Sequence, residues 1–445
     1  MQLGQDDLND AALSNALNNM ARKVYDAGDF DIDMMAEAEA MEMTGATFEH
    51  FQKAIEKGLR DSEHAGYKVS PVIRYALENN AFVFSGFKTY HMLREVGLSI
   101  TDDAGNIKPF ERFLKDVHTV DERYNRNYLR AEYNHAVGSS MMAAQWQKVE
   151  QDGDRYDLQY RTANDSRVRP EHAVLDGITL PVSDPFWNFY YPPNDWNCRC
   201  NAVQVLKGKF PESDPKEAMR LGNNSTDTPK KKMFRFNSGK TLGVFPPKHP
   251  YYKVPKKDKE KIRKLTDEKI REKRIKAIIK QLEGNLTDEE KKAKAANIYE
   301  IEKALNVSAG KAMSIEKADK QNANPNYGKS RGYGINCQTC APAYALRRSG
   351  LDVTAKENTS GSQLDYLSRG MHCWEIWKNQ NGTQATHTRI NDWLRKNNFL
   401  QMTPKRYQQF FEESCKETGI YEVSIGWKGG GGHATILERT ADGKL

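Results

Sequence analysis

The stretch that decides the fold of this chain begins Arg167-Val-Arg-Pro-Glu-His172 and ends Pro192-Pro-Asn-Asp-Trp-Asn-Cys198-Arg-Cys200. Turn-forming Pro, Asn and Asp alternate here with aromatic residues, which predicts short strands and turns. Two thiolates one residue apart, an upstream imidazole and a carboxylate could supply the N, S and O ligands of zinc. The Cys-x-Cys spacing is tighter than the usual spacing of zinc ligands. A second interpretation is therefore equally open: a turn region in which the histidine and the cysteines are hydrogen-bonded core groups. The four candidate ligands are Asp165, His172, Cys198 and Cys200.

This stretch resembles the phage Mu F-like head morphogenesis family, the minor head proteins of tailed bacteriophages. The likeness rests on Arg-x-Arg-Pro-x-His, a following Asp-Gly, Pro-Pro-x-x-Trp and Asn-Cys-Arg-Cys, and it is dense from about residue 146 to residue 206. It implies a virion protein, in the capsid interior or near the portal, that acts in capsid assembly and DNA packaging or ejection. Portal and capsid proteins are the implied partners, and no catalysis is implied. The matching positions are His172, Cys198 and Cys200.

The residues before this stretch follow helical periodicity. Four apolar residues recur at the spacing of one helix face, and Gly28 ends the pattern. The four are Leu13, Leu17, Met20 and Val24. A second helix is expected over residues 48–59, where Gly58 weakens the end, and one or two more over residues 109–143. We therefore expect residues 1–206 to form an α-rich minor head module.

Composition limits the class of protein. The chain has 445 residues, enough for two or three domains. Its 67 basic and 60 acidic residues give a net charge of +7, which by itself is not that of a nucleic-acid binder. No stretch approaches the ~18 consecutive apolar residues of a membrane span, and no secretory signal is expected at the N-terminus. Six cysteines do not make a disulfide scaffold, so we expect thiols, metal ligands or a nucleophile.

Residues 207–329 have the composition of a charged linker. Lysine-rich and proline-rich runs precede a long charged helix predicted over residues 256–282. Its apolar stripe is thin and its acidic and basic residues alternate, which favours a solvated helix face. A DNA-contacting arm or a partner helix is the alternative. The turn-rich stretch from Asn322 to Gly334 marks the expected boundary with the next domain.

The C-terminal region contains a second group of chemically active side chains. Cys337 and Cys340 lie at the start of a predicted helix and share one face, and His433 begins an apolar strand after four glycines. A helix N-terminus and a nearby imidazole both lower the pKa of a thiol, so a Cys–His nucleophile is one interpretation. Three others stay open: a zinc site completed by His372 and Cys373, a redox pair, and a structural helix with a satisfied core histidine.

Two short motifs of this region look like those of papain-fold toxin domains, which occur at the C-terminus of bacterial polymorphic toxins and some phage head proteins. They are Asn336-Cys-Gln-Thr-Cys340-Ala with the residues that follow, and the Gly-His-Ala-Thr-Ile-Leu segment around His433. The resemblance implies a papain-like α+β domain over residues 330–445. It also implies a cysteine protease or protein-glutamine deamidase that acts on an unknown host protein.

Within this resemblance, Cys340 fits the nucleophile better than Cys337, and His433 is the base. Asn336 or Gln338 would be the oxyanion donor. The third catalytic residue should follow the histidine strand, but Asp442 lies in an apparent turn where it is poorly placed. We therefore expect that the domain is truncated, that it is inactive, or that a group elsewhere in the chain orients the catalytic histidine. Its other expected elements are a helix from residue 344, a strand over 351–355, a helix over 404–417, and strands over 421–427 and 433–438.

The sequence thus predicts a multidomain α+β protein: an α-rich minor head module, a charged helical linker and a papain-like α+β domain. We expect a virion protein that is present in the host bacterial cytoplasm during assembly or after delivery. No cofactor is required, although zinc is possible in the N-terminal module. The alternative is a purely structural minor capsid protein with an inactive or zinc-stabilised C-terminal domain.

Overall fold

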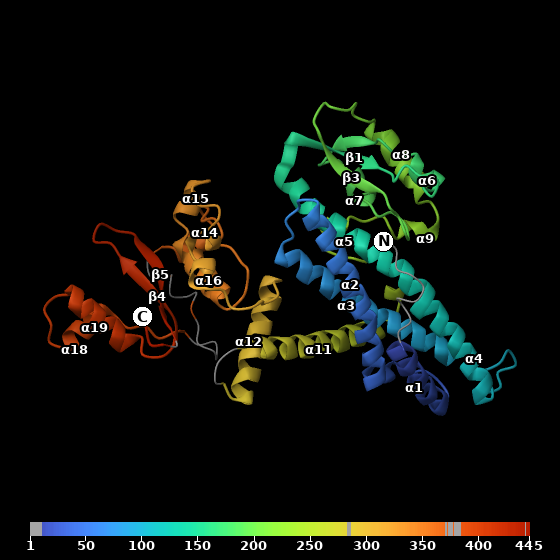
Figure 1. The fold of residues 1–445 in the computed structure, drawn as a ribbon, viewed down its shortest axis with the longest axis horizontal. Helices are drawn as coiled ribbons and strands as arrows, with labels where there is room; N and C mark the ends of the chain where they lie inside the picture. The colour runs from blue at the N-terminus through green and yellow to red at the C-terminus, as the bar shows by residue number, and fades with distance from the viewer. Residues whose placement is uncertain (1–10, 283–285, 370–371, 373–376, 378–383, 441) are drawn as a thin grey trace. The chain divides into compact units, whose positions relative to one another are not determined.

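The computed structural model describes residues 11–282, 286–369, 372, 377, 384–440 and 442–445 (Figure 1). It divides the chain into two compact units, residues 1–306 and 307–445. The predicted boundaries were residues 206 and 329, so the division after Asn306 differs from both. None of the helices in the described ranges combines the length and apolar character that a membrane span needs.

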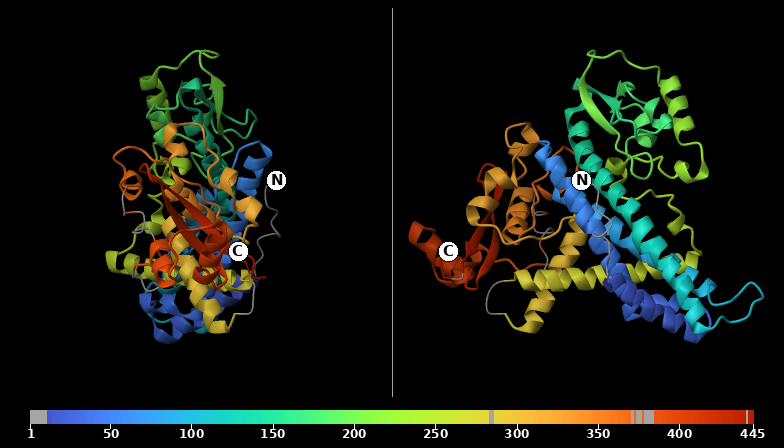
Figure 2. Two further views of the ribbon diagram at one scale, coloured as in Figure 1. Left: turned by 90° about the vertical axis from the view of Figure 1, so that its left-hand side faces the viewer. Right: turned by 45° about the vertical axis from the view of Figure 1, so that its right-hand side comes forward.

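The first unit begins with a bundle of long helices. Its elements are α1 (Ala11–Ala27), the 3-10 turn η2 (Ile32–Ala36), α2 (Ala38–His64), α3 (Pro71–Leu98), α4 (Phe110–Asp121), the π-helical segment η3 (Glu122–Tyr128) and α5 (Leu129–Asp152). The apolar face predicted for the first helix is confirmed, because all four of its residues are buried in α1. Gly28 follows that helix with a φ of 81°, a conformation that glycine adopts without strain. Figure 2 shows α4, η3 and α5 as one continuous rod.

Helix α2 continues through Gly58, where the sequence predicted a weak end. A Cβ atom at this position would lie 2.3 Å from the carbonyl oxygen of Val137 in α5. The missing side chain therefore lets the backbones of α2 and α5 approach closely, and this packing stabilises the longer helix.

A small sheet follows the bundle and has a core of its own. It consists of β1 (Tyr156–Arg161), β2 (Thr179–Pro181) and β3 (Asn201–Leu206), with the 3-10 turn η4 (Gly153–Arg155) and the short helices α6 (Pro170–Ala173) and α7 (Phe186–Phe189). The strands are antiparallel in the order β2-β1-β3, and Tyr160 pairs with Ala202. Large aromatic side chains fill the core under this sheet, among them Trp146, Trp187 and Tyr191. The short strands and turns predicted for this stretch are confirmed.

Residues 207–306 pack onto the first unit, although their composition predicted a linker. Their elements are α8 (Pro215–Ser225), α9 (Pro229–Lys232), α10 (Ser238–Thr241), the 3-10 turn η5 (Pro250–Tyr252), α11 (Lys256–Gln281) and α12 (Asp288–Leu305). Buried aromatic residues of this segment pack against the helical bundle. The ring of Phe245 stacks on Phe84 of α3 at a centroid distance of 3.7 Å. Hydrophobic burial of such rings outweighs the polar composition around them.

The predicted charged helix is confirmed as α11, and it packs along α3. Ile262 and Thr266 are buried at this contact, where a Cβ on Gly86 would lie 2.4 Å from the Thr266 methyl group. Most of its basic residues pair with acidic ones of α11 itself or of neighbouring segments. The pairing fits the solvated helix face, and DNA contact remains a prediction.

The second unit contains several short helices and one described hairpin. They are α13 (Ile315–Ala318), α14 (Lys320–Ala323), α15 (Arg331–Gly334), α16 (Cys337–Arg348), α17 (Gln363–Leu367), α18 (Ile390–Lys396), α19 (Pro404–Ser414), β4 (Gly419–Gly426) and β5 (Gly432–Arg439). The predicted helices and the two glycine-linked strands are confirmed. Residues 351–355 were predicted to be a strand, but they have no regular secondary structure. Ala355 instead packs with Ala323 of α14 and Ala343 of α16 in a small apolar cluster. The papain-like fold remains a prediction.

Candidate metal centre

The candidate metal centre lies at the edge of the small sheet in the first unit. His172 sits on α6, a single turn that begins at Pro170, whose fixed φ suits the first helical position. Cys198 and Cys200 lie in the loop that leads into β3, and Cys200 belongs to the aromatic core beneath the sheet. The side chain of His172 is only 2% exposed, so the imidazole is held inside the protein.

The three side chains converge on one point. The Nδ1 atom of His172 lies 3.7 Å from the Sγ atom of Cys198 and 3.7 Å from that of Cys200. The three atoms all lie within 4.8 Å of one another. A tetrahedral zinc ion with Zn–N of ~2.05 Å and Zn–S of ~2.3 Å requires N···S separations of about 3.6 Å. The observed spacing is compatible with three ligands of one zinc ion, and equally with hydrogen bonds between the imidazole and the two thiols.

Backbone and side-chain bonds hold the cysteine loop in place. The backbone N–H of Cys198 donates to the carbonyl of Asp195 at 3.2 Å. The guanidinium of Arg169 donates to the carbonyl of Trp196 at 2.7 Å, which ties the loop to the residue before α6. The loop and the histidine therefore share one support, as a preformed ligand set requires.

Asp165, the fourth predicted ligand, is engaged elsewhere. Both of its carboxylate oxygens accept from the guanidinium of Arg199, at 2.6 and 2.7 Å. Arg199 thereby holds the pKa of Asp165 well below its usual range. Asp165 is not part of the group formed by the histidine and the two cysteines. Sequence spacing could not reveal this, because the side chain of the residue between the two cysteines captures the carboxylate.

The surroundings of the two sulfur atoms differ. Hydrogen bonding from Cys200 and from His172 lowers the pKa of the Cys198 thiol well below its usual value, against the effect of burial. The backbone N–H of Asn194 acts in the same direction. The neighbouring Cys198 and burial raise the pKa of the Cys200 thiol, while the phenol of Tyr160 lowers it. The Tyr160 hydroxyl also donates to the side chain of Asn194 at 3.0 Å.

The donor set suits zinc, which prefers thiolate and imidazole ligands. Both cysteines also line a cavity of about 320 Å³ beside α2 and α5. The other ring nitrogen of His172, Nε2, is buried without a hydrogen bond among the described residues. Sequence reasoning missed Tyr160 and Asn194, since no local spacing marks a residue that contacts a ligand across the sheet.

The second predicted site is arranged differently. Cys337 and Cys340 lie in the first turns of α16, and Cys340 donates to the side-chain oxygen of Asn336 at 3.3 Å. Burial raises the pKa of Cys340 to about 11, the opposite of activation. His433 is exposed at the start of β5, paired with Ile425, and no described hydrogen bond joins it to either cysteine.

Helix α16 does pack against β5, but at the far end of the strand. The carboxylate of Glu438 accepts from the hydroxyl of Tyr344 at 3.0 Å and from the guanidinium of Arg348 at 2.8 Å. Glu438 is five residues from His433, which is about 17 Å along a strand. The described contacts between α16 and β5 therefore do not bring His433 to Cys340.

The other predicted residues of the second unit have structural partners. Asn336 is buried, and its amide donates to the carbonyl of Lys356 at 2.8 Å while its oxygen accepts from Asn324 at 3.0 Å. Gln338 is buried on α16. Asp442 interacts with Lys444 at 3.1 Å in a turn after β5. The alternative zinc pair of His372 and Cys373 falls partly outside the described residues, because Cys373 is not among them.

Comparison with known proteins identifies one region of similarity. Residues 103–203 match the model of the family described as Phage Mu protein F like protein. The "Mu-like prophage FluMu F protein" of Haemophilus influenzae is 30% identical over 188 residues, which is 39% of this chain and 42% of the relative. The "Putative capsid assembly protein F" of Escherichia phage Mu is 33% identical over 117 residues, 25% of this chain and 24% of the relative. No solved structure matches the chain.

The chain thus spans less than half the length of each of these two relatives. The matched residues include α4, η3, α5 and the small sheet up to the middle of β3, and they contain the histidine and both cysteines of the candidate metal centre. Residues 103–203 of this chain are similar to the Phage Mu protein F like family.

Proposed function

We propose that this chain acts in assembling the head of a phage or prophage, as a capsid-associated protein of the virion. The observation that carries the proposal is the family match over residues 103–203, together with a relative whose name describes capsid assembly. Portal and capsid proteins are the proposed partners. The metal centre lies within the matched region, so we assign it a structural role in the assembly module.

In this proposal zinc joins two segments of the module. His172 of α6 and Cys200 before β3 are 28 residues apart in the sequence, and a shared ion would hold them together. Because such a site does not exist in the unfolded chain, the free energy of metal binding becomes free energy of folding. Bound zinc would supply this cross-link and no reaction.

The test is made in the phage or prophage that encodes the chain. Deletion of residues 103–203 should abolish intact heads in electron micrographs of lysates, and the Cys198→Ser/Cys200→Ser variant should strongly reduce them. Cys415→Ser is the control, because Cys415 is buried like Cys200 but lies in the second unit. Unchanged heads after the deletion would exclude the assembly role, whereas unchanged heads in the double variant alone would exclude only the metal.

A cysteine-dependent effector in residues 307–445 is the second candidate function. What supports it is the resemblance of the residues around Cys340 and His433 to papain-fold toxin domains. Helix α16 packs against β5, but at the end of the strand away from His433. As an effector it would act as a protease or protein-glutamine deamidase on a host protein, with Cys340 as nucleophile. Its thiol would have to be activated from a raised pKa, so His433 would have to move towards it.

Alkylation kinetics distinguish this candidate from a structural unit. Iodoacetamide labelling of the full chain, followed against pH with mapping of the modified cysteine, reports the thiol pKa. An effector requires fast labelling of Cys340 below pH 7 that is lost in His433→Ala. Slow labelling that rises only at alkaline pH and ignores His433→Ala would exclude it.

A further inference from the structure

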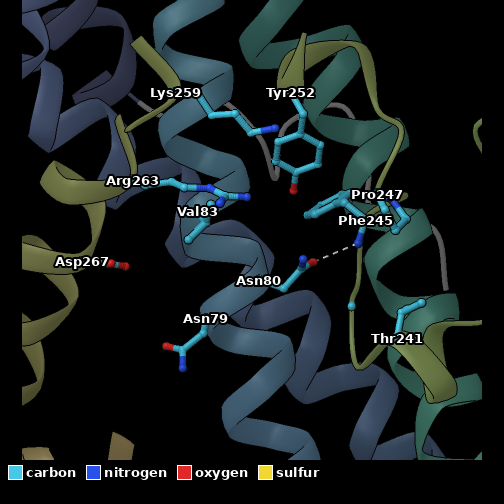
Figure 3. Close-up of a pocket in the computed structure, with 11 residues that line it drawn as sticks. Asn79, Asn80, Val83, Thr241, Phe245, Pro247, Tyr252, Lys259, Arg263 and Asp267 are labelled. Carbon is cyan, nitrogen blue, oxygen red and sulfur yellow. Dashed lines mark hydrogen bonds between the residues drawn. The ribbon is translucent and has the colours of Figure 1, made fainter. Parts of the chain in front are cut away.

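A cavity of about 480 Å³ in the first unit is not used by the candidate metal centre (Figure 3). Helix α3, the segment from Thr241 to Tyr252 and helix α11 form its walls. Its size lies within the ~300–1,000 Å³ typical of ligand pockets. The cavity is therefore large enough for a side chain or a small ligand.

Two cationic side chains of α11 line this cavity and have no ion-pair partner among the described residues. Lys259 and Arg263 are four residues apart, so they project from the same face of the helix. In the described part of the chain, the basic residues of α11 that form ion pairs are Lys256, Lys261, Lys264, Lys269, Arg271, Lys273, Arg274 and Lys276. The two cations that face the cavity are not among them, so their charge is available to a ligand.

Neutral hydrogen-bond donors also line the cavity, beside the two cations. The side-chain oxygen of Asn80 accepts from the backbone N–H groups of Val244 and Phe245, at 2.8 and 3.1 Å. These bonds fix the amide, and its Nδ2 group has no described partner. Burial raises the pKa of Tyr252 far above its usual value, so the hydroxyl stays protonated and can donate. Figure 3 shows this hydroxyl and the Arg263 guanidinium directed into the same space.

The charge and shape of the lining specify the ligand. Asp267 is the single acidic residue among the lining residues, so two cations and one anion leave a positive excess. Val83, Phe245 and Pro247 add apolar wall beside the donors. A guanidinium fork binds a carboxylate through two parallel hydrogen bonds, and the apolar wall suits the methylene groups that carry one.

We propose that this cavity binds a carboxylate side chain from an acidic segment of a partner protein. The recess between α3 and α11 suits an inserted side chain, whereas duplex DNA lies across an exposed surface. The inference does not depend on the role in head assembly.

The test is isothermal titration calorimetry on the full chain. The probes are a short peptide containing Glu-Leu-Glu, the same peptide with Gln-Leu-Gln, inorganic phosphate and a short DNA duplex. We expect the acidic peptide to bind, and Arg263→Gln to weaken it about tenfold, because a charge-assisted bidentate contact is lost. Lys259→Gln should weaken it independently. The matched control is Lys264→Gln, which removes an equal charge from the same helix but lies outside the cavity.

Each outcome decides the question. Binding of the acidic peptide that falls in Arg263→Gln and Lys259→Gln but not in Lys264→Gln supports the proposal. Equal weakening by all three variants overturns it, since that is the behaviour of a diffuse surface charge. Equal binding of both peptides, or binding of phosphate or DNA without the acidic peptide, also overturns it. Arg263 is exposed, so its variant should keep the melting temperature of the parent.

Discussion

The Nδ1 atom of His172 lies 3.7 Å from the Sγ atom of Cys200, across 28 residues of sequence. This distance is compatible with two ligands of one zinc ion. We predict that the purified chain holds about one zinc ion, as a single site of this kind would. Zinc content is measured by mass spectrometry, and affinity by competition with a chromophoric chelator.

Two substitutions at this site distinguish a zinc ligand from a residue that only lies near the ligands. Cys200→Ser removes a ligand, so affinity for zinc should fall by more than the ~10–100-fold caused by changing a residue next to a ligand. Asp165→Asn should cost less than about tenfold, because its carboxylate binds Arg199 and not the metal group. A large effect of Asp165→Asn, or a chain that takes up no zinc, would contradict the assignment.

Two glycines of α2 should respond in opposite directions to the same substitution. Gly58→Ala places a methyl group 2.3 Å from the carbonyl oxygen of Val137, so α2 and α5 must separate, at a cost of about 1–3 kcal/mol. Gly45→Ala meets no atom within 4 Å, and alanine should stabilise the helix by about 0.5–1 kcal/mol. Urea unfolding of both variants measures the difference. Equal effects would show that the interhelix contact is looser than described.

Regular elements could be predicted from the sequence because their periodicity is local. The apolar face of α1, for example, follows from spacing along one short segment. The candidate metal residues could be predicted in part, because a Cys-x-Cys pair and an upstream histidine are rare residue types close together. The role of Asp165 could not, since it depends on Arg199 reaching across from another segment.

The packing of the segment after β3 could not be predicted, because its composition is that of a charged linker. Lysine and proline are the most frequent residues of 207–255, and a few aromatic residues are buried in the core, among them Phe234, Phe236 and Phe245. The one sequence pattern that indicates a buried segment here is Phe-x-Phe followed by a second aromatic cluster. The cavity of Lys259, Arg263 and Asn80 could not be predicted, because it exists only where this segment crosses two helices.

A buried ion pair in the helical bundle should be sensitive to removal of one partner. Lys88 of α3 and Glu132 of α5 are bonded to each other inside the core, where burial lowers the pKa of the lysine and raises that of the glutamate. Lys88→Met leaves a buried carboxylate without its partner and should cost about 3–5 kcal/mol. Lys88→Met/Glu132→Leu should recover most of this loss. Denaturant unfolding measures both, and a double variant as unstable as the single one would contradict the explanation.

The stability of the first unit should fall in acid because two buried histidines must remain neutral. Burial lowers the pKa of His135 and of His249 to about 3, whereas an unfolded histidine titrates near ~6.5. The unfolded chain therefore binds more protons between these two values. Stability is fully present above about pH 6.5 and is lost as pH falls towards about 3, at roughly 1 kcal/mol per pH unit for each histidine.

The contribution of one histidine can be isolated from the slope. Unfolding free energy measured by urea between about pH 7 and pH 4 should depend less on pH in His135→Gln, by roughly 1 kcal/mol per pH unit. Carboxylates add to the slope in both proteins and cancel in the difference. His118→Gln is the control, because His118 is exposed on the surface of α4. If His135→Gln keeps the parental slope, its imidazole is already protonated or hydrated in the folded protein, and the acid sensitivity arises elsewhere.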